Sequence, residues 1–158
     1  MPSTDPAREL FRHTLATLAY RGGKAIHSAP TSFADFNDSG KTPAQILAHI
    51  GDLLDWGLSM AKGKQVWQDS KPLPWMKESE RFFDSLRQFD EYLSSPDPLH
   101  APLEKLFQGP IADALTHVGQ IAMLRRVAGA AMKGENYFVA EIVVGRVGPD
   151  QASPKRQF

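Results

Sequence analysis

The sequence predicts an all-α fold built from four amphipathic helices joined by long connections. Four segments repeat apolar residues at helical spacing, and stretches rich in proline and glycine separate them. A length of 158 residues fits one domain with one hydrophobic core. We therefore expect one helical domain over residues 1–148, followed by a mobile C-terminal tail over residues 149–158.

The first predicted helix covers residues 6–28, with Asp5 as its candidate N-cap. The adjacent Gly22 and Gly23 either weaken this helix or let another element approach it closely. Residues 30–41, which are rich in turn-forming side chains, predict a long loop. The apolar residues that repeat along the helix are Phe11, Leu15, Leu18 and Ile26.

The second predicted helix has the clearest start. Thr42 is followed by a proline and then, three residues on, by Gln45, which is the pattern of a capping box. Residues at spacings of 3, 4, 3 and 4 then form a stripe that we expect to face the interior. The members of this stripe are Ile46, His49, Leu53, Trp56 and Met60.

Proline and glycine residues make 62–77 a second long connection, and the third helix follows over residues 78–93. Its apolar face carries Phe82, Leu86, Phe89 and Leu93. The fourth helix is expected from Gly109 to Met132, ended by Gly134. One face of it carries Asp113, His117, Ile121, Leu124 and Ala128. The apolar residues 137–144 predict a short strand or an extended strap packed on the helices.

Composition excludes several classes of function. The chain has no cysteine, so disulfides, zinc-thiolate sites and thiol nucleophiles are ruled out. Its 18 basic and 18 acidic residues balance, so no net field favours nucleic acid or an anionic membrane. No run of about 18 apolar residues is present to span a membrane, and the first ten residues lack the pattern of a signal peptide. We expect a cytoplasmic protein.

Three side chains predict a divalent-metal site. Asp113 and His117 stand four residues apart, so they share one helix face. His49 belongs to the stripe of another helix, and helical bundles assemble metal sites from such inward-facing residues. Three ligands with open positions are typical of a catalytic site, and imidazole with carboxylate suits Zn, Ni, Fe or Mn. Trp56 and Gln120 are then candidates to line the pocket.

A structural interpretation of the same residues stays open. A histidine in an apolar stripe is often a hydrogen-bonded core residue, and the helix macrodipole alone favours an aspartate such as Asp113 in a first turn. The remaining histidines, His13, His27 and His100, fall outside the predicted site.

Two pairs of charged residues are expected to be solvated. Arg125 and Arg126 come late in their helix, where they offset the C-terminal dipole. Asp52 and Asp55 flank the stripe of the second helix, although Asp52 could orient an imidazole from outside the ligand set.

Two segments resemble the DinB-like (YfiT-like) superfamily. Residues 42–56, which read TPAQILAHIGDLLDW, are similar to its second helix, and residues 113–126, which read DALTHVGQIAMLRR, to its metal-bearing later helix. The resemblance implies a four-helix bundle with long crossover loops and a metal held by three histidines. His49 and His117 match two of these, whereas Asp113 stands where the family usually has the third.

The resemblance also implies a range of functions. Relatives include hydrolases that depend on a metal and S-transferases that depend on a thiol, so we expect a small electrophilic substrate. The alternatives are a stress-related or metal-binding protein without catalysis, and a bundle in which His49, Asp113 and His117 only satisfy one another. A homodimer is also expected, because closed two-fold pairs are the commonest assembly.

Overall fold

A computed structural model describes residues 5–38 and 40–158, so residues 1–4 of the N-terminal segment and Ser39 of the predicted loop lie outside it. The long helices are α1 (Pro6–Ile26), α2 (Pro43–Ala61), α3 (Trp75–Ser94) and α5 (Ala112–Val127). None of the described residues forms a strand beyond one isolated bridge, which confirms the all-α class. None of the described helices is both long enough and apolar enough to cross a membrane.

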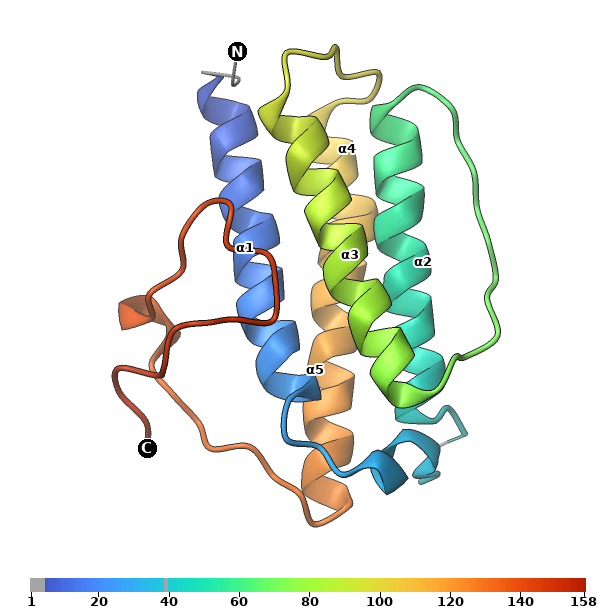
Figure 1. Cartoon of the computed structure of the whole chain (residues 1–158), viewed down its shortest axis with the longest axis vertical. Helices are drawn as coiled ribbons and strands as arrows, with labels where there is room; N and C mark the ends of the chain where they lie inside the picture. Colours follow the sequence, from blue (N-terminus) through green and yellow to red (C-terminus); the bar gives the residue numbers. More distant parts are fainter. Residues whose placement is uncertain (1–4, 39) are drawn as a thin grey trace.

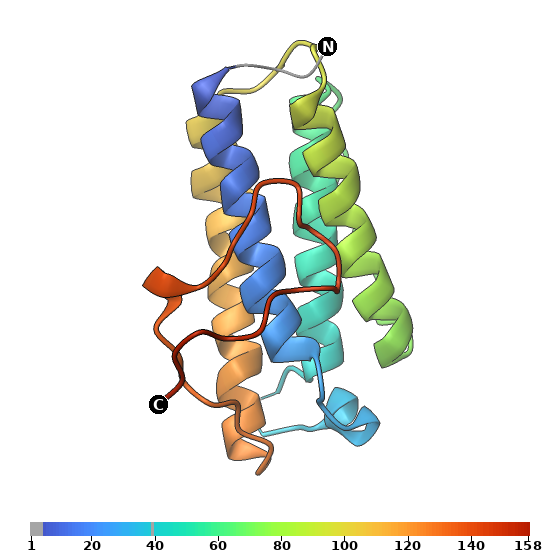
Figure 2. The ribbon, with the colours of Figure 1, turned by 60° about the vertical axis from the view of Figure 1, so that its left-hand side comes forward.

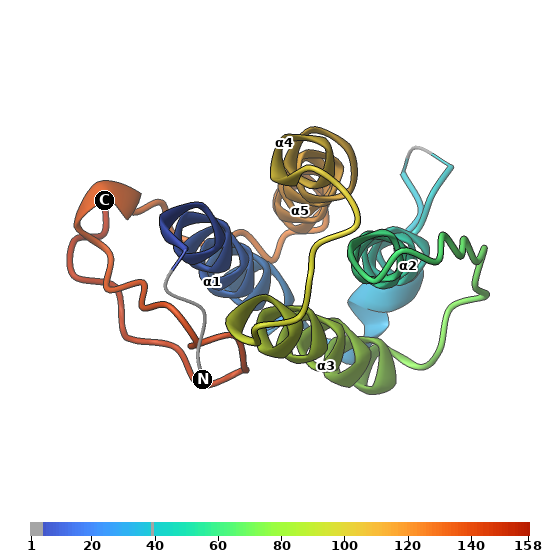
Figure 3. The ribbon, with the colours of Figure 1, turned by 90° about the horizontal axis from the view of Figure 1, so that it is seen from above.

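The four long helices lie side by side along the long axis of the molecule (Figure 1). Seen from above, they occupy the corners of a square in the order α1, α3, α2, α5 (Figure 3). Helices α2 and α3 run in the same direction, so the chain must return along the whole of α2 between them. A helix of 19 residues is about 28 Å long, which explains why the 62–74 connection is extended.

The N-terminal caps form as the sequence predicts. The carboxylate of Asp5 accepts a hydrogen bond from the amide of Ala7 at 2.9 Å, and both halves of the Thr42–Gln45 capping box are present. Helix α3 instead begins at Trp75, three residues before its predicted start. Trp75 is buried and packs edge-on against Phe33, so tertiary packing extends this helix toward Pro74.

The predicted bounds of the fourth helix were wrong at both ends. The helix starts at α4 (Leu103–Leu106) and passes through a π-helical segment, η2 (Phe107–Ile111), which accommodates Pro110 inside the helix. It ends at Val127 because Gly129, at φ +79°, adopts the left-handed conformation of a Schellman motif. The amide of Ala130 donates to the Arg125 carbonyl, and that of Gly129 to the Arg126 carbonyl.

The core sits between the four helices, and the aromatic face of α3 is its centre. The predicted face of α3 is fully buried, with Phe82, Leu86, Phe89 and Leu93 all at 0% exposure. Gly22 lets α1 approach α3 closely, since a Cβ there would lie 2.5 Å from the Phe82 ring. The close-approach interpretation of this glycine is therefore confirmed.

The expectation that Arg125 is solvated was wrong. Its side chain is 5% exposed and donates to carbonyl oxygens at the ends of α1 and α5, whereas Arg126 is exposed as predicted. The C-terminal carbonyls of two helices meet there, and they provide acceptors that the sequence of α5 alone cannot reveal.

The segments outside the long helices contain two short 3-10 helices. The predicted loop 30–41 contains η1 (Thr31–Asp35), and the predicted strap contains η3 (Tyr137–Val139) but no strand. The strap and the residues after it cross α1 (Figure 2), and Ile142 of the strap and Val147 beyond it pack in or against the core. The mobility of residues 149–158 stays a prediction; this segment forms backbone hydrogen bonds to Gly134 and Asn136.

Candidate metal site

The three predicted ligands converge on the seam between α2 and α5. His49 comes from the middle of α2, and Asp113 and His117 lie one turn apart on α5. The ring centroids of His49 and His117 are 4.8 Å apart with the planes nearly perpendicular. The prediction that these two helices are neighbours, with the imidazoles facing each other, is confirmed.

The carboxylate of Asp113 lies between the two imidazoles. Its Oδ2 is 3.6 Å from His49 Nε2, and its Oδ1 is 3.4 Å from His117 Nε2. These distances exceed those of good hydrogen bonds. All three potential ligand atoms lie within 4.8 Å of one another. Two ligands at about 2.1 Å from one zinc ion can be at most about 4.2 Å apart, so a small closing motion suffices.

Gln120 fixes the orientation of one imidazole. Its Oε1 lies 2.7 Å from His117 Nδ1, one helical turn further along α5. Because an amide oxygen is an acceptor, a neutral ring that donates its Nδ1–H here would turn its Nε2 lone pair toward Asp113. Histidines that bind metals are held in the same way by an acceptor on their second nitrogen. Gln120, which was predicted to line the pocket, therefore contacts the candidate ligand His117.

Asp113 is the second residue of α5, but the helical backbone does not begin there, which removes the macrodipole explanation of this aspartate. The helix continues on its N-terminal side through η2 to Leu103, so the free amides of the first helical turn lie about two to three turns away. The macrodipole effect falls off within the first turn. It therefore provides no reason for an aspartate at this position.

The stripe on α2 is only partly interior, which corrects its prediction. Ile46 and Leu53 are buried, but His49, Trp56 and Met60 are half-buried along the α2–α5 seam. The side chains of the candidate ligands are 30% exposed for His49, 47% for Asp113 and 21% for His117. Solvent and small molecules can therefore reach the site without the bundle opening.

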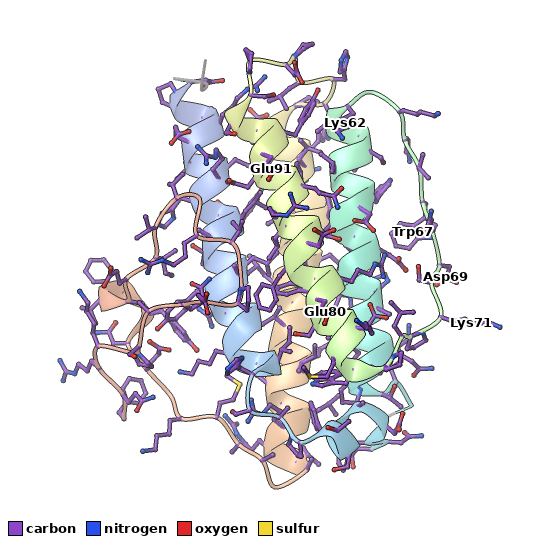
Figure 4. The ribbon with its side chains drawn as sticks, viewed as in Figure 1. Lys62, Trp67, Asp69, Lys71, Glu80 and Glu91 are labelled. Atoms are coloured by element: carbon purple, nitrogen blue, oxygen red, sulfur yellow. The ribbon has the colours of Figure 1, made fainter. Side chains whose placement is uncertain are left out.

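Trp67 is a further residue of the site that the sequence interpretation missed. It comes from the 62–74 connection and lies on the α2 side of it, whereas Lys71 extends away (Figure 4). Its ring packs edge-on against His49 and against Trp56, with centroids 5.7 Å apart in both cases. The sequence signal is a tryptophan in a connection with few other large apolar residues. Trp56 has a buried indole N–H without a partner among the described residues.

Asp52 is buried on another face of α2, so two expectations about it were wrong. It is 1% exposed, and it accepts hydrogen bonds from the amide and hydroxyl of Ser70 and from Arg81 at 2.6–2.9 Å. Burial alone would raise the pKa of its carboxyl, but these hydrogen bonds and the Arg81 charge lower it overall. Asp52 therefore anchors the 62–74 connection and does not orient His49, while Asp55 is exposed as predicted.

The other histidines stay outside the site as expected. His13 is exposed on α1, His27 is the C-cap of that helix, and His100 is exposed in the loop before α4. Among the described residues, His49, Asp113 and His117 are the group whose geometry could hold a metal ion.

Comparison with known proteins returned no matching family model, no matching curated protein and no matching solved structure.

Proposed function

We propose that this chain is a DinB-like four-helix bundle that binds a divalent metal through His49, Asp113 and His117. The observation that carries the proposal is the convergence of two imidazole nitrogens and a carboxylate from two helices within 4.8 Å. The resemblance of residues 42–56 and 113–126 to the DinB-like superfamily supports the same assignment.

The electrostatics of the triad favour a bound cation. In the neutral tautomer that donates Nδ1–H to Gln120, the Nε2 lone pair of His117 faces an Asp113 oxygen at 3.4 Å. Two acceptors at this distance repel unless a positive charge lies between them. A metal ion satisfies His49, Asp113 and His117 at once, whereas a proton joins only two of them.

The donor set limits the choice of metal. Two nitrogens and one oxygen suit zinc, nickel, iron(II) or manganese and not copper(I), which prefers sulfur. When bound with open positions, such an ion lowers the pKa of a coordinated water or thiol and so supplies a nucleophile near neutral pH. We infer a metal-dependent hydrolase or thiol S-transferase that acts on a small electrophile.

Residues around the candidate metal site would orient a ligand and contact the substrate. Gln120 holds the tautomer of His117, and the partial exposure of Asp113 leaves an approach for substrate. The rings of Trp56 and Trp67 form an apolar wall beside His49, against which an apolar part of the substrate can pack.

The test begins with elemental analysis of protein purified without added metal, followed by calorimetric titration of zinc into chelator-stripped protein. We expect one ion per chain and a melting temperature that chelator lowers. His49→Ala should abolish this binding, whereas His13→Ala, which removes an exposed histidine of α1, should leave it unchanged. Equal binding by the two variants would remove the proposed site.

A screen of the loaded protein then separates catalysis from binding alone. Turnover of ester substrates identifies a hydrolase, and consumption of an electrophile that requires added low-molecular-weight thiol identifies an S-transferase. Stoichiometric metal without turnover of either class would instead support the alternative, a metal-binding bundle protein without catalysis.

A further inference from the structure

A cavity lies at the C-terminal ends of α1 and α5, away from the candidate metal site. It has a volume of about 430 Å³ and is enclosed by the C-terminal ends of α1 and α5 and by the segment that follows α5. That segment crosses α1 in Figure 2 and lines the cavity with Pro149, Gln151 and Pro154. No residue of the candidate metal site lines it.

Arg125 contributes a buried positive charge to this cavity. Its Nε donates to the Ala130 carbonyl at 2.9 Å, and its Nη1 lies 2.9–3.2 Å from the carbonyl oxygens of Lys24, Ala25 and His27. Its Nη2 forms no hydrogen bond to any described residue, and no described carboxylate forms an ion pair with the guanidinium. Buried charges in proteins are normally paired with an opposite charge. The guanidinium of Arg125 is buried without such a partner among the described residues.

The single carboxylate of the cavity already has its own partners. Glu135 has a side chain that is 0% exposed, and it accepts hydrogen bonds from Tyr20 Oη and Lys24 Nζ at 2.7 Å each. Burial and this hydrogen bond raise the pKa of Tyr20 well above its usual value, so the phenol stays a donor to Glu135. The charge of Glu135 is therefore balanced by Lys24 and is not free to neutralise Arg125.

The lining as a whole carries an excess of positive charge. Its cations are Lys24, Arg125 and Lys133, against the one carboxylate of Glu135. Lys133 is exposed at the rim and forms no ion pair with a described residue. Beside these charges lie Ala131, Met132 and the two prolines of the C-terminal segment, which give the cavity an apolar wall.

We propose that this cavity binds a small organic anion, with its charged group at Arg125 Nη2 and Lys133 and its apolar part against Met132. The volume lies within the range of small-molecule sites, which combine an apolar lining with a few placed polar groups. Burial lowers the pKa of Arg125, and an anion beside it would relieve this desolvation cost. The proposal is independent of the metal site, because the two share no residue.

The experiment titrates three ring compounds into the full-length ¹⁵N-labelled protein and follows the backbone amides of residues 131–135 and 151–153 by NMR. Benzoate and phenyl phosphate carry the two common anionic groups, and benzyl alcohol is their neutral analogue. We expect saturable shifts in these amides with a Kd in the millimolar range for at least one anion, and binding at least about ten-fold weaker for the alcohol. The tighter of the two anions identifies the recognised group.

Substitution of Lys133 tests the charge without disturbing the fold. Lys133→Gln should weaken anion binding about three-fold, the effect of one exposed ion pair, whereas Lys105→Gln, a remote exposed lysine of α4, should not. Arg125 is left intact, because its hydrogen bonds to carbonyls tie α1 to α5.

Three results would overturn the proposal. They are equal binding of benzyl alcohol and the anions, shifts that map to α2 instead of the cavity, and no binding of either anion at about 20 mM. Equal affinity of the two lysine variants for the anion would also count against it. The affinity for the anion should be the same after metal has been removed from the protein. The anion titration therefore tests this proposal even if the metal proposal fails.

Discussion

Helix α2 carries two polar clusters on different faces, and they differ in how well their charges are satisfied. On the face toward α3, Asp52 is 1% exposed. Its carboxylate accepts three hydrogen bonds of 2.9 Å or less, two from Ser70 and one from Arg81. Toward α5, the Asp113 carboxylate is 47% exposed and meets two imidazole nitrogens at 3.4 and 3.6 Å, beyond hydrogen-bond range. The Asp52 carboxylate therefore has short hydrogen bonds from other residues of the chain, and the Asp113 carboxylate does not.

This difference separates a structural cluster from a candidate binding site. A buried carboxylate whose lone pairs are filled by protein donors contributes to the fold and has no capacity for a ligand. A carboxylate that faces two imidazoles without a short hydrogen bond contributes little to the fold and can take a cation as its partner. Substitutions in the first cluster should therefore change stability, and those in the second should change metal affinity.

The largest effect is expected at Asp52. Asp52→Ala removes the partner of Arg81 and the anchor of the 62–74 connection at Ser70, so the free energy of unfolding should fall by about 3–5 kcal/mol. Urea denaturation measures this loss. Asp55→Ala is the matched control, since Asp55 also contacts Arg81 but is half-exposed, and we expect a loss of about 1 kcal/mol or less.

Equal decreases in the free energy of unfolding of Asp52→Ala and Asp55→Ala would contradict this prediction. They would show that the burial of Asp52 adds nothing to stability. Where Asp52→Ala stays folded at low temperature, its affinity for zinc per folded chain should match that of the wild type. A large decrease would mean that the two faces of α2 are coupled.

The next effect concerns Asp113. Asp113→Ala leaves two histidine ligands, and we expect zinc affinity to fall more than about 100-fold, beyond the loss typical of outer residues around a metal. Asp113→His supplies a third imidazole and should retain binding, with zinc or nickel favoured over manganese. Calorimetry on stripped protein measures both variants.

Stability should change by about 1 kcal/mol or less in each Asp113 variant, because the side chain is half-exposed and lacks short hydrogen bonds. If Asp113→Ala bound zinc as tightly as the wild type, Asp113 would be no ligand.

A smaller effect is expected at Gln120. Gln120→Leu removes the acceptor for His117 Nδ1 and should lower metal affinity about 10- to 100-fold by freeing the tautomer and the ring orientation. Gln120→Glu keeps an acceptor oxygen at the same place and should retain affinity close to that of the wild type. Titration of zinc into the two variants distinguishes loss of this hydrogen bond from loss of side-chain bulk, and weak binding by both would contradict its importance.

The sequence predicted the elements whose signals are local. The capping box of Thr42 and Gln45 depends on residues within one turn, and the apolar face of α3 depends on helical spacing alone. The meeting of His49 with His117 was also predictable, since two inward faces and a family resemblance indicated the same pair of helices.

The features that the sequence did not predict depend on residues distant in the chain. Asp52 is buried because Ser70 and Arg81 reach it from a connection and from another helix, and Arg125 because α1 presents its final carbonyls to it. Trp67 reaches the site from an irregular segment without periodicity. A proline normally ends a helix, but Pro110 lies inside one because the π-helical segment accommodates it.

The smallest effect is the dependence of stability on acid, which again belongs to the Asp52 cluster. Burial by itself raises the pKa of Asp52, but the hydrogen bonds from Ser70 and Arg81 and the Arg81 charge outweigh it, so the folded pKa lies below the unfolded value of about 3.9. A carboxyl with a lowered folded pKa stabilises the fold fully above the unfolded pKa and loses this contribution as pH falls through the folded pKa. The gap in unfolding free energy between wild type and Asp52→Asn should therefore be constant from pH 7 to about pH 5 and narrow below about pH 4. Urea denaturation of both proteins across this range measures the gap, and a gap that widened in acid would show that the Asp52 carboxylate is destabilising in the folded state.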